Sequence, residues 1–364
     1  MPDKRLNVAI VGCGWVSDWH VRDGLAHLPQ AFRILACCDP NEQRRNAFGD
    51  RYNIERRVSD IDSILAFEDI DVVAICTPPS THYSLILQAL EAGKHVVCEK
   101  PLTESLQLTD RIIEAERHSR GRVMPVFQYR FGDGIAKVRH VIQAGLAGKA
   151  FVASVETAKS RGPDYYAAVW RGRFATELGG VLLTQSIHNH DLLLWLLGSV
   201  NSVSCAKTTR VNPIEVEDCA VAGLTFADGS LASLTATLGS ARQLVRFRLC
   251  FENVTFEREA FDESSSSPGD EPWTVIPRNR DLAAQITAKM DEVPTARRGF
   301  ARQYELFYHA LGTDSALPVT LADARRSLEL VTAMFQSAET GRAESLPIGP
   351  GHPKYDGWAP QPSR

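Results

Sequence analysis

The chain has 364 residues, a length that predicts about two domains and a sizeable core. Apolar residues make up 44% and charged residues 23%, which is ordinary globular usage and excludes a mainly disordered chain. Forty basic residues stand against 44 acidic ones, and this formal charge of -4 gives no excess of Lys and Arg for nucleic acid or an anionic membrane.

The cysteine pattern and the apolar runs indicate the compartment. Eight cysteines are scattered without a C-x-x-C pair, so we expect buried, reduced thiols and no metal site. Polar residues interrupt the longest apolar stretch, Val181 to Leu197, and no signal-peptide core follows the N-terminus. These features predict a cytoplasmic protein.

The first third of the chain has the pattern of an α/β fold. From Leu6 to about Met124, short β-branched runs alternate with helical stretches, as a doubly wound parallel sheet requires. The expected strands are 7–11, 33–38, 72–76, 95–98 and 122–126, with helices at 82–92 and 106–119. We therefore predict a dinucleotide-binding domain over residues 1–127.

The rest of the chain predicts an α+β domain over 128–345 with a large, open, mostly antiparallel sheet. Longer alternating runs predict strands at 151–157, 200–209, 219–226, 230–238 and 245–255. Ala227-Asp228-Gly229 predicts a hairpin turn between two of them. Helices are expected at 281–291, 298–311 and 321–340, and exposed loops at 261–272 and in a tail over 346–364.

A glycine-rich turn follows the first strand and opens a helix. In Gly12-Cys-Gly14-Trp15-Val16-Ser17, the first glycine makes the turn and the second lets the backbone approach a pyrophosphate. We assign Gly12, Gly14, Trp15 and Val16 to the cofactor site. A packing role is the alternative for Trp15, and a tight connection without ligand is the alternative for the turn.

Asp39 ends the second strand, where a carboxylate accepts hydrogen bonds from an adenosine ribose. A carboxylate repels a 2′-phosphate, so the cofactor is expected to be NAD. Arg44 and Arg45 follow closely and keep NADP open, and a helix N-cap is the alternative role for Asp39.

Two further motifs follow later strands of the same sheet. Thr77-Pro78-Pro-Ser-Thr-His82 is a polar turn at the carboxyl edge, where ligands of doubly wound folds bind, although His82 equally fits the first turn of a helix. Glu99-Lys100-Pro101 places a charged pair after the next strand, where partial burial would let the lysine exchange a proton. A surface turn is the alternative.

In this order and spacing, the four motifs resemble those of the glucose-fructose oxidoreductase and inositol dehydrogenase (Gfo/Idh/MocA) family. The resemblance implies an N-terminal Rossmann domain and a C-terminal domain whose open sheet carries substrate contacts and oligomer interfaces, and thus a homodimer or homotetramer. It also implies that Lys100 contacts the nicotinamide ribose and the substrate hydroxyl, and it allows a cis peptide before Pro101.

Residues 179–198 predict an apolar helix with glycine at both ends. Steps of four, three and four place Thr184, His188, Asp191 and Trp195 on one face. The stretch is similar to the family's second signature, in which His188 matches the catalytic histidine and Asp191 the last acid. Thr184 replaces the first acid and cannot supply a negative charge, which leaves Lys100 and His188 as the acid/base pair. A structural His188–Asp191 pair is the alternative.

The resemblance adds residues from two other segments. Trp170 and Arg171 match a segment that approaches nicotinamide and substrate, and Gln128 matches a position that faces substrate; a surface arginine is the alternative for Arg171. The residues implied to bind substrate are Lys100, Gln128, Arg171, Thr184 and His188.

We therefore expect an NAD(P)-dependent dehydrogenase that oxidises a secondary alcohol of a cyclic polyol, a pyranose sugar or an inositol, to a ketone by hydride transfer. Lys100 is the expected base, and His188 orients the hydroxyl or shares its proton. Two alternatives use the same residues: redox-neutral, NAD-dependent glycoside cleavage, and a non-catalytic sensor that binds NAD.

Overall fold

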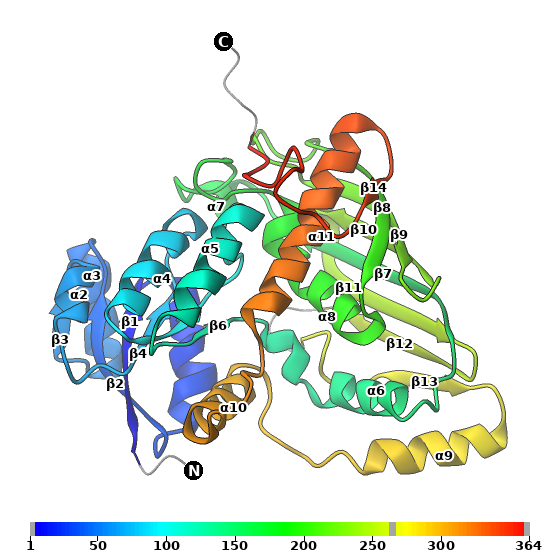
Figure 1. The fold of residues 1–364 in the computed structure, drawn as a ribbon, viewed down its shortest axis with the longest axis horizontal. Helices are drawn as coiled ribbons and strands as arrows, with labels where there is room; N and C mark the ends of the chain where they lie inside the picture. The colour runs from blue at the N-terminus through cyan, green and yellow to red at the C-terminus, as the bar shows by residue number, and fades with distance from the viewer. Residues whose placement is uncertain (1–3, 262–266, 360–364) are drawn as a thin grey trace. The chain divides into compact units, whose positions relative to one another are not determined.

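The computed structural model describes residues 4–261 and 267–359 and divides into two compact units (Figure 1). The first contains the chain up to Phe127 together with Gly299–Arg325, and the second contains Gln128–Arg298 and the chain from Arg326 on. Residues 299–325, which the sequence analysis placed in the second domain, therefore pack in the first unit.

The first unit is built on a parallel sheet. In its described part the sheet has six strands in the order β3-β2-β1-β4-β5-β6, the order of a Rossmann fold. This confirms the predicted doubly wound sheet. The strands are β1 (Leu6–Val11), β2 (Phe32–Cys38), β3 (Arg56–Val58), β4 (Val72–Ile75), β5 (His95–Cys98) and β6 (Val123–Pro125). Sequence analysis missed β3 because three half-buried residues give no readable alternation.

Capped helices cover this sheet. Asn41 accepts from the Arg44 N–H at the start of α2, and Ser105 does the same for Leu108 at the start of α5. The helices are α1 (Trp15–Trp19), α2 (Glu42–Tyr52), α3 (Ile61–Leu65), α4 (His82–Glu91), α5 (Leu106–Arg117) and α10 (Gly299–Thr313). Helix α10 packs in the first unit although it comes late in the chain, because it buries aromatic side chains there: the ring of Tyr304 packs edge-on against Phe32 of β2.

The second unit is built on a mixed sheet that confirms the predicted α+β class. In its described part the sheet has eight strands in the order β13-β12-β11-β7-β10-β9-β8-β14, and of these pairs β10 with β7 is parallel while the others are antiparallel. The strands are β7 (Ala150–Ser160), β8 (Val200–Thr208), β9 (Cys219–Phe226), β10 (Leu231–Thr237), β11 (Gly239–Phe251), β12 (Val254–Ala260), β13 (Thr274–Pro277) and β14 (Glu344–Ser345).

The predicted turn at Ala227-Asp228-Gly229 is confirmed, because Gly229 has φ +86° between β9 and β10. The single strand predicted over 245–255 is wrong. Glu252 and Asn253 turn the chain there, and this run contributes to two antiparallel strands, β11 and β12. Asn253 holds the turn, since its side-chain amide donates to Leu146 O over 3.0 Å.

The helices of the second unit lie against one face of this sheet (Figure 1). Asn189 of α8 donates to Thr157 Oγ1 of β7 over 2.8 Å, which fixes that helix on the sheet. The helices are a 3-10 turn (Gln128–Phe131), α6 (Asp133–Gln143), α7 (Pro163–Tyr166), a π-helical turn (Val181–Gln185), α8 (Ile187–Leu197), α9 (Arg280–Asp291) and α11 (Leu321–Thr340), whose first residues belong to the first unit.

Two segments predicted as exposed loops are partly buried. In the tail, Trp358 stacks on Phe335 at 5.5 Å between ring centroids and donates to Leu178 O. The prediction of an exposed tail is therefore wrong at the buried Ile348, Tyr355 and Trp358. In the other loop, Pro268 and Gly269 are buried, and Ile135 N–H donates to Gly269 O. Residues 262–266 and 360–364 of these predictions lie outside the described residues.

All eight cysteines are free thiols; five are buried as expected, whereas Cys205, Cys219 and Cys250 are half-buried. In the part of the chain that the structure describes, no helix combines the length and apolar character needed to span a membrane.

Candidate active site

The four sequence motifs of the first unit lie along one edge of its sheet. Strands β2, β1, β4 and β5 are adjacent and parallel, so their carboxyl ends form a row. Asp39 follows β2, Gly12 follows β1, Thr77 lies just beyond β4, and Glu99-Lys100 follows β5. This edge is where doubly wound folds bind ligands.

The two glycines of the first turn are needed for different reasons. Gly12 has φ +93°, and a Cβ there would lie 2.8 Å from the carbonyl of Cys76, so the turn excludes any side chain. A Cβ on Gly14 would meet nothing within 4 Å. Local packing therefore does not explain the second glycine, whereas open space in front of the backbone fits a group that approaches it closely.

Residues after the second glycine divide between core and surface. Ser17 is fully buried and donates to Gly14 O over 2.5 Å. Trp15 is 59% exposed and lies beside Trp19, with 4.1 Å between ring centroids. Trp15 therefore packs against a neighbouring ring, in line with the alternative of a packing role, although more than half of its surface is exposed. Val16 is half-buried.

Asp39 is buried and organises the glycine turn. Its Oδ2 accepts from Cys13 N–H over 2.9 Å, and its Oδ1 accepts from Asn41 N–H over 2.8 Å. The carboxylate retains lone pairs for two further donors, as a ribose diol requires. Arg45 donates to Asp39 O over 2.6 Å, whereas Arg44 is exposed.

His82 is the first residue of α4 and connects two of the motifs. Its Nδ1 lies 2.8 Å from Pro101 O and its Nε2 lies 3.0 Å from Thr77 O. Burial lowers the pKa of this fully enclosed imidazole, against the opposing effect of its backbone partners. Each ring nitrogen faces a main-chain carbonyl, and the neutral ring donates to one of the two. Pro78 precedes the 3-10 turn that leads to the helix.

The Glu99-Lys100-Pro101 turn contains a buried carboxylate, a half-buried lysine and the cis peptide that the resemblance allows. Glu99 Oε2 accepts from the Lys100 N–H over 3.1 Å, and its Oε1 lies 3.0 Å from His20 Nε2. Tyr304 completes this cluster, with its hydroxyl 2.7 Å from His20 Nδ1.

In the second unit, the helix predicted over 179–198 is interrupted. It consists of the π-helical turn, Ser186 and α8, and it ends at Gly198 with φ +89°. The buried Glu217 carboxylate accepts from the N–H groups of Gly180 and Leu182, each over 3.1 Å. Burial raises the pKa of Glu217 to about 7.

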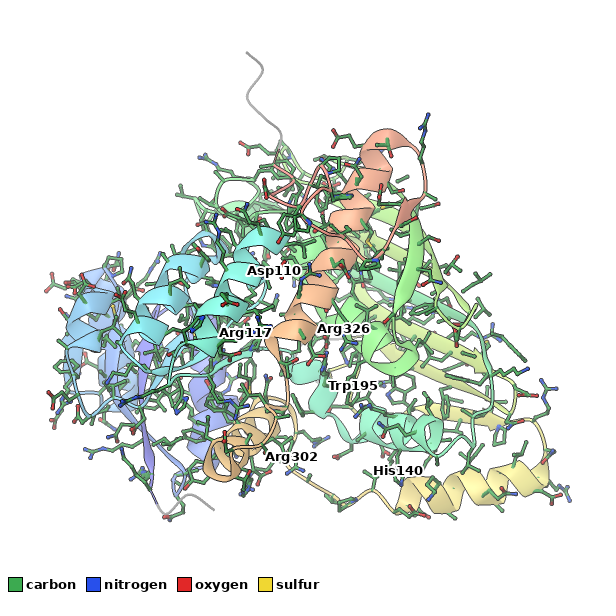
Figure 2. All side chains as sticks on the ribbon, in the orientation of Figure 1. Asp110, Arg117, His140, Trp195, Arg302 and Arg326 are labelled. Carbon is green, nitrogen blue, oxygen red and sulfur yellow. The ribbon has the colours of Figure 1, made fainter. Side chains whose placement is uncertain are left out.

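His188 and Asp191 contact neighbouring residues of the 3-10 turn. His188 is buried with its ring 4.5 Å from that of Tyr129, whereas Asp191 accepts from Arg130 Nε over 2.7 Å and from its Nη2 over 2.5 Å. Arg130 also lies over the ring of Trp195, which is labelled on α8 in Figure 2. Asp191 therefore anchors the 3-10 turn that carries Tyr129.

Two expected substrate residues belong to the same segments: Gln128 to the 3-10 turn and Thr184 to the π-helical turn before α8. Thr184 is buried and donates to Gly180 O over 2.9 Å within its own turn. Gln128 begins the 3-10 turn, and its buried Oε1 has no hydrogen-bond partner among the described residues. An unsatisfied buried acceptor is costly, so it fits a donor supplied by a ligand.

Arg171 is held firmly inside its loop. Its guanidinium lies 3.8 Å from the ring centroid of Tyr165 and 4.2 Å from that of Trp170, and it forms an ion pair with Glu177 over 3.0 Å. It also donates to the Tyr165 hydroxyl, which receives a second bond from Gln185. The alternative of a loose surface arginine is wrong.

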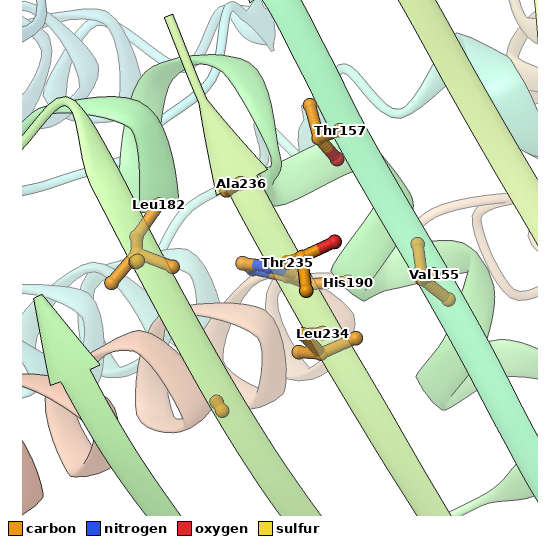
Figure 3. Close-up of a pocket in the computed structure, with 9 residues that line it drawn as sticks. Val155, Thr157, Leu182, His190, Leu234, Thr235 and Ala236 are labelled. Carbon is orange, nitrogen blue, oxygen red and sulfur yellow. The ribbon is translucent and has the colours of Figure 1, made fainter. Parts of the chain in front are cut away.

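His190 points toward the strands of the sheet (Figure 3). It lines a cavity of about 10 Å³ with Val155, Thr157 and Thr235, and its Nδ1 has no hydrogen-bond partner among the described residues. Burial lowers its pKa to about 3, so the imidazole is neutral. No cluster of three or more His, Cys, Asp or Glu side chains in the described ranges could hold a metal ion.

Family models match both units. Residues 6–127 match the model described as an oxidoreductase family with an NAD-binding Rossmann fold, and residues 135–257 match the GFO/IDH/MocA C-terminal domain. The chain belongs to the Gfo/Idh/MocA family. It is therefore an oxidoreductase with an NAD-binding domain, as the resemblance of its motifs implies.

Similar proteins share this organisation. D-glucoside 3-dehydrogenase of Escherichia coli is 25% identical over 95% of this chain and 99% of its own length. The NAD(+)-dependent scyllo-inositol 2-dehydrogenase of Bacillus subtilis is 28% identical over 65% of this chain and 68% of its own. The WlbA dehydrogenase of Bordetella pertussis, solved with NADH and UDP-GlcNAcA, is 26% identical with a TM-score of 0.83 and covers 96% of this chain and 100% of its own.

The residues of this Gfo/Idh/MocA protein fit NAD. Gly14 leaves open space at the start of α1, and Asp39 retains lone pairs at the end of β2. NAD would be held by the glycine turn and the Asp39 carboxylate, and Lys100 lies on the same edge of the sheet.

Sequence reasoning missed His20, Tyr304 and the role of Arg130. His20 and Glu99 are 79 positions apart, and His20 and Tyr304 are 284 apart. No local pattern could pair residues so far apart. The signals that the sequence offers are a histidine soon after the glycine turn and an arginine four residues after Val126.

Proposed function

We propose that this oxidoreductase oxidises a secondary alcohol of a cyclic polyol, a pyranose sugar or an inositol, to a ketone with NAD as oxidant. The observation that carries the proposal is the placement of the half-buried Lys100 on the sheet edge that bears Gly12 and Asp39. The names of the glucoside, inositol and levoglucosan dehydrogenases among its relatives support this substrate class.

The residues of the chain divide the task between binding and proton transfer. NAD, when bound, accepts a hydride from the carbinol carbon. Lys100 Nζ takes the hydroxyl proton, which avoids a high-energy free alkoxide. His188 orients the hydroxyl or shares that proton. The ring of Tyr129 packs against His188, and the Arg130–Asp191 pair fixes the turn that carries Tyr129.

Five more residues are proposed to serve the substrate pocket and the cofactor site. Gln128 Oε1 offers an unused acceptor to a substrate hydroxyl, whereas Thr184 supplies a hydroxyl where the family has an acid. Arg171 stacks on the ring of Trp170, and this pair would contact the nicotinamide and the substrate. His82 acts by holding the Thr77 and Pro101 turns rather than by direct contact.

The proposal is tested by following the near-ultraviolet absorbance of NADH while the protein meets pyranoses, inositols and anhydrosugars. We expect reduction with at least one compound, and a loss of about a hundredfold or more in kcat for Lys100→Ala measured at saturating NAD. Lys137→Ala is the matched control, because Lys137 belongs to the second unit and forms an ion pair with Glu271 there. Wild-type turnover in Lys100→Ala would refute the assignment of the base.

The same proposal includes a homodimer or homotetramer through the outer face of the second sheet. Leu231 and Val152 are paired across β10 and β7 and are 50% and 46% exposed, and Val221 of β9 is 54% exposed. Apolar side chains in register on an open sheet favour burial against a second copy. Sedimentation equilibrium would show a dimer or larger, and a monomer at micromolar concentration would contradict this.

A further inference from the structure

A buried ionic contact lies beside Lys100 inside the first unit. His20 directly follows α1, and Glu99 directly follows β5, yet His20 Nε2 and Glu99 Oε1 are 3.0 Å apart. The two side chains are 0% and 7% exposed. A carboxylate so enclosed is expensive unless a cation or several donors compensate it.

The environment of His20 favours the charged ring. Its Nδ1 lies 2.7 Å from the hydroxyl of Tyr304 on α10. Its other neighbours are the ring of Phe300 and Cys76, the residue that follows β4 in the chain. Burial opposes the charge, but Cys76, Tyr304 and Glu99 together outweigh it and hold the pKa of His20 well above its usual value. Both ring nitrogens of the imidazolium can therefore donate.

The environment of Glu99 links this pair to Lys100. Its Oε2 accepts from the main-chain N–H of Lys100 over 3.1 Å. Burial would raise the pKa of Glu99, but the bond and charge of His20 and the charge of Lys100 hold it below its usual value. The carboxylate thus fixes the backbone of the lysine while its charge acts on the ammonium group.

We propose that His20 and Glu99 are positioning residues for Lys100, in which Glu99 fixes the lysine backbone and His20 neutralises Glu99 so that the amine can be uncharged when it accepts a proton. This proposal rests on the proposed function for the role of Lys100 as base, but not for the contacts themselves. It also gives the histidine behind the glycine turn a function in catalysis rather than in cofactor binding.

Removal of one partner and removal of both have opposite consequences. His20→Gln retains a donor for Glu99 but leaves its charge uncompensated, so the pKa of Lys100 rises by about one unit. The double variant His20→Gln/Glu99→Gln removes both charges and returns the pKa of Lys100 close to that of the wild type. A merely structural pair would predict that the double variant is at least as impaired as the single one.

The pKa of Lys100 can be measured without substrate by competitive acylation of the full chain and peptide mass spectrometry. At a pH below the pKa, we expect about tenfold slower acylation of Lys100 in His20→Gln and near-wild-type acylation in the double variant. Lys149, which is exposed in the second unit, is the internal control and should not change. Equal rates in wild type and His20→Gln would overturn the proposal.

A second measurement uses the wild type and does not depend on the folding of a variant. The ¹⁵N shifts of the His20 ring should show an imidazolium at pH 7, and a neutral ring there would refute the ion pair. Neither measurement involves turnover. Equal acylation rates or a neutral His20 ring therefore count against this inference, whereas an active Lys100→Ala enzyme counts against the proposed function.

Discussion

Glu217→Gln is expected to make the stability of this protein less dependent on pH. Glu217 is 2% exposed and accepts from Gly180 and Leu182 at the start of the π-helical turn. Burial raises its pKa from 4.5 to about 7. The folded state therefore binds a proton that the unfolded state releases between these values, and its stability decreases as the pH rises through that window.

The magnitude follows from this shift. With a pKa of 4.5 unfolded and about 7 folded, the destabilisation is about 0.8 kcal/mol at pH 5 and about 3.4 kcal/mol at pH 8. A glutamine retains the Oε1 acceptor but carries no charge to bury. The free energy of unfolding of the variant relative to wild type should therefore rise by about 2.5 kcal/mol between pH 5 and pH 8.

Urea denaturation followed by circular dichroism at several pH values measures this difference. Glu215→Gln is the matched control, because Glu215 is exposed two residues away, and its difference from wild type should stay flat. A constant difference for Glu217→Gln would show that the carboxyl titrates normally. A variant that becomes less stable than wild type as pH rises would show that the ionised carboxylate stabilises the helix start, which refutes the reasoning.

Two further substitutions test other buried charges. Arg130→Met leaves Asp191 buried without its bidentate partner and should lower the free energy of unfolding by about 3–5 kcal/mol. The double variant Arg130→Met/Asp191→Leu should recover most of that loss in the same urea titration. A double variant as unstable as Arg130→Met would contradict this. Asp39→Asn should weaken binding of NADH by about tenfold and that of NADPH by less, measured by cofactor fluorescence, and an equal loss for both would show that Asp39 acts only on the turn.

Glu217 and His20 show the limit of sequence reasoning most clearly. Both are buried ionisable residues outside the recognised motifs, and their partners are separated from them by 37 and 79 positions. A sequence indicates which residues are polar but not which of them are enclosed, so the perturbed groups had no signal. Asp191 had a signal in its place on an apolar helix, but its bidentate bond from Arg130 joins residues 61 positions apart, and no local pattern shows such a pair.

The amino-acid sequence by itself determined five parallel strands of the first unit, the order of its four motifs and hence the family. Local rules suffice there, because a glycine with φ +93° and buried β-branched runs leave few alternatives. Only the tertiary structure decided that α10 returns to the first unit, that Trp358 is buried and that His20 pairs with Glu99. Those outcomes depend on contacts between distant segments, whose free energy exists only once both surfaces have formed.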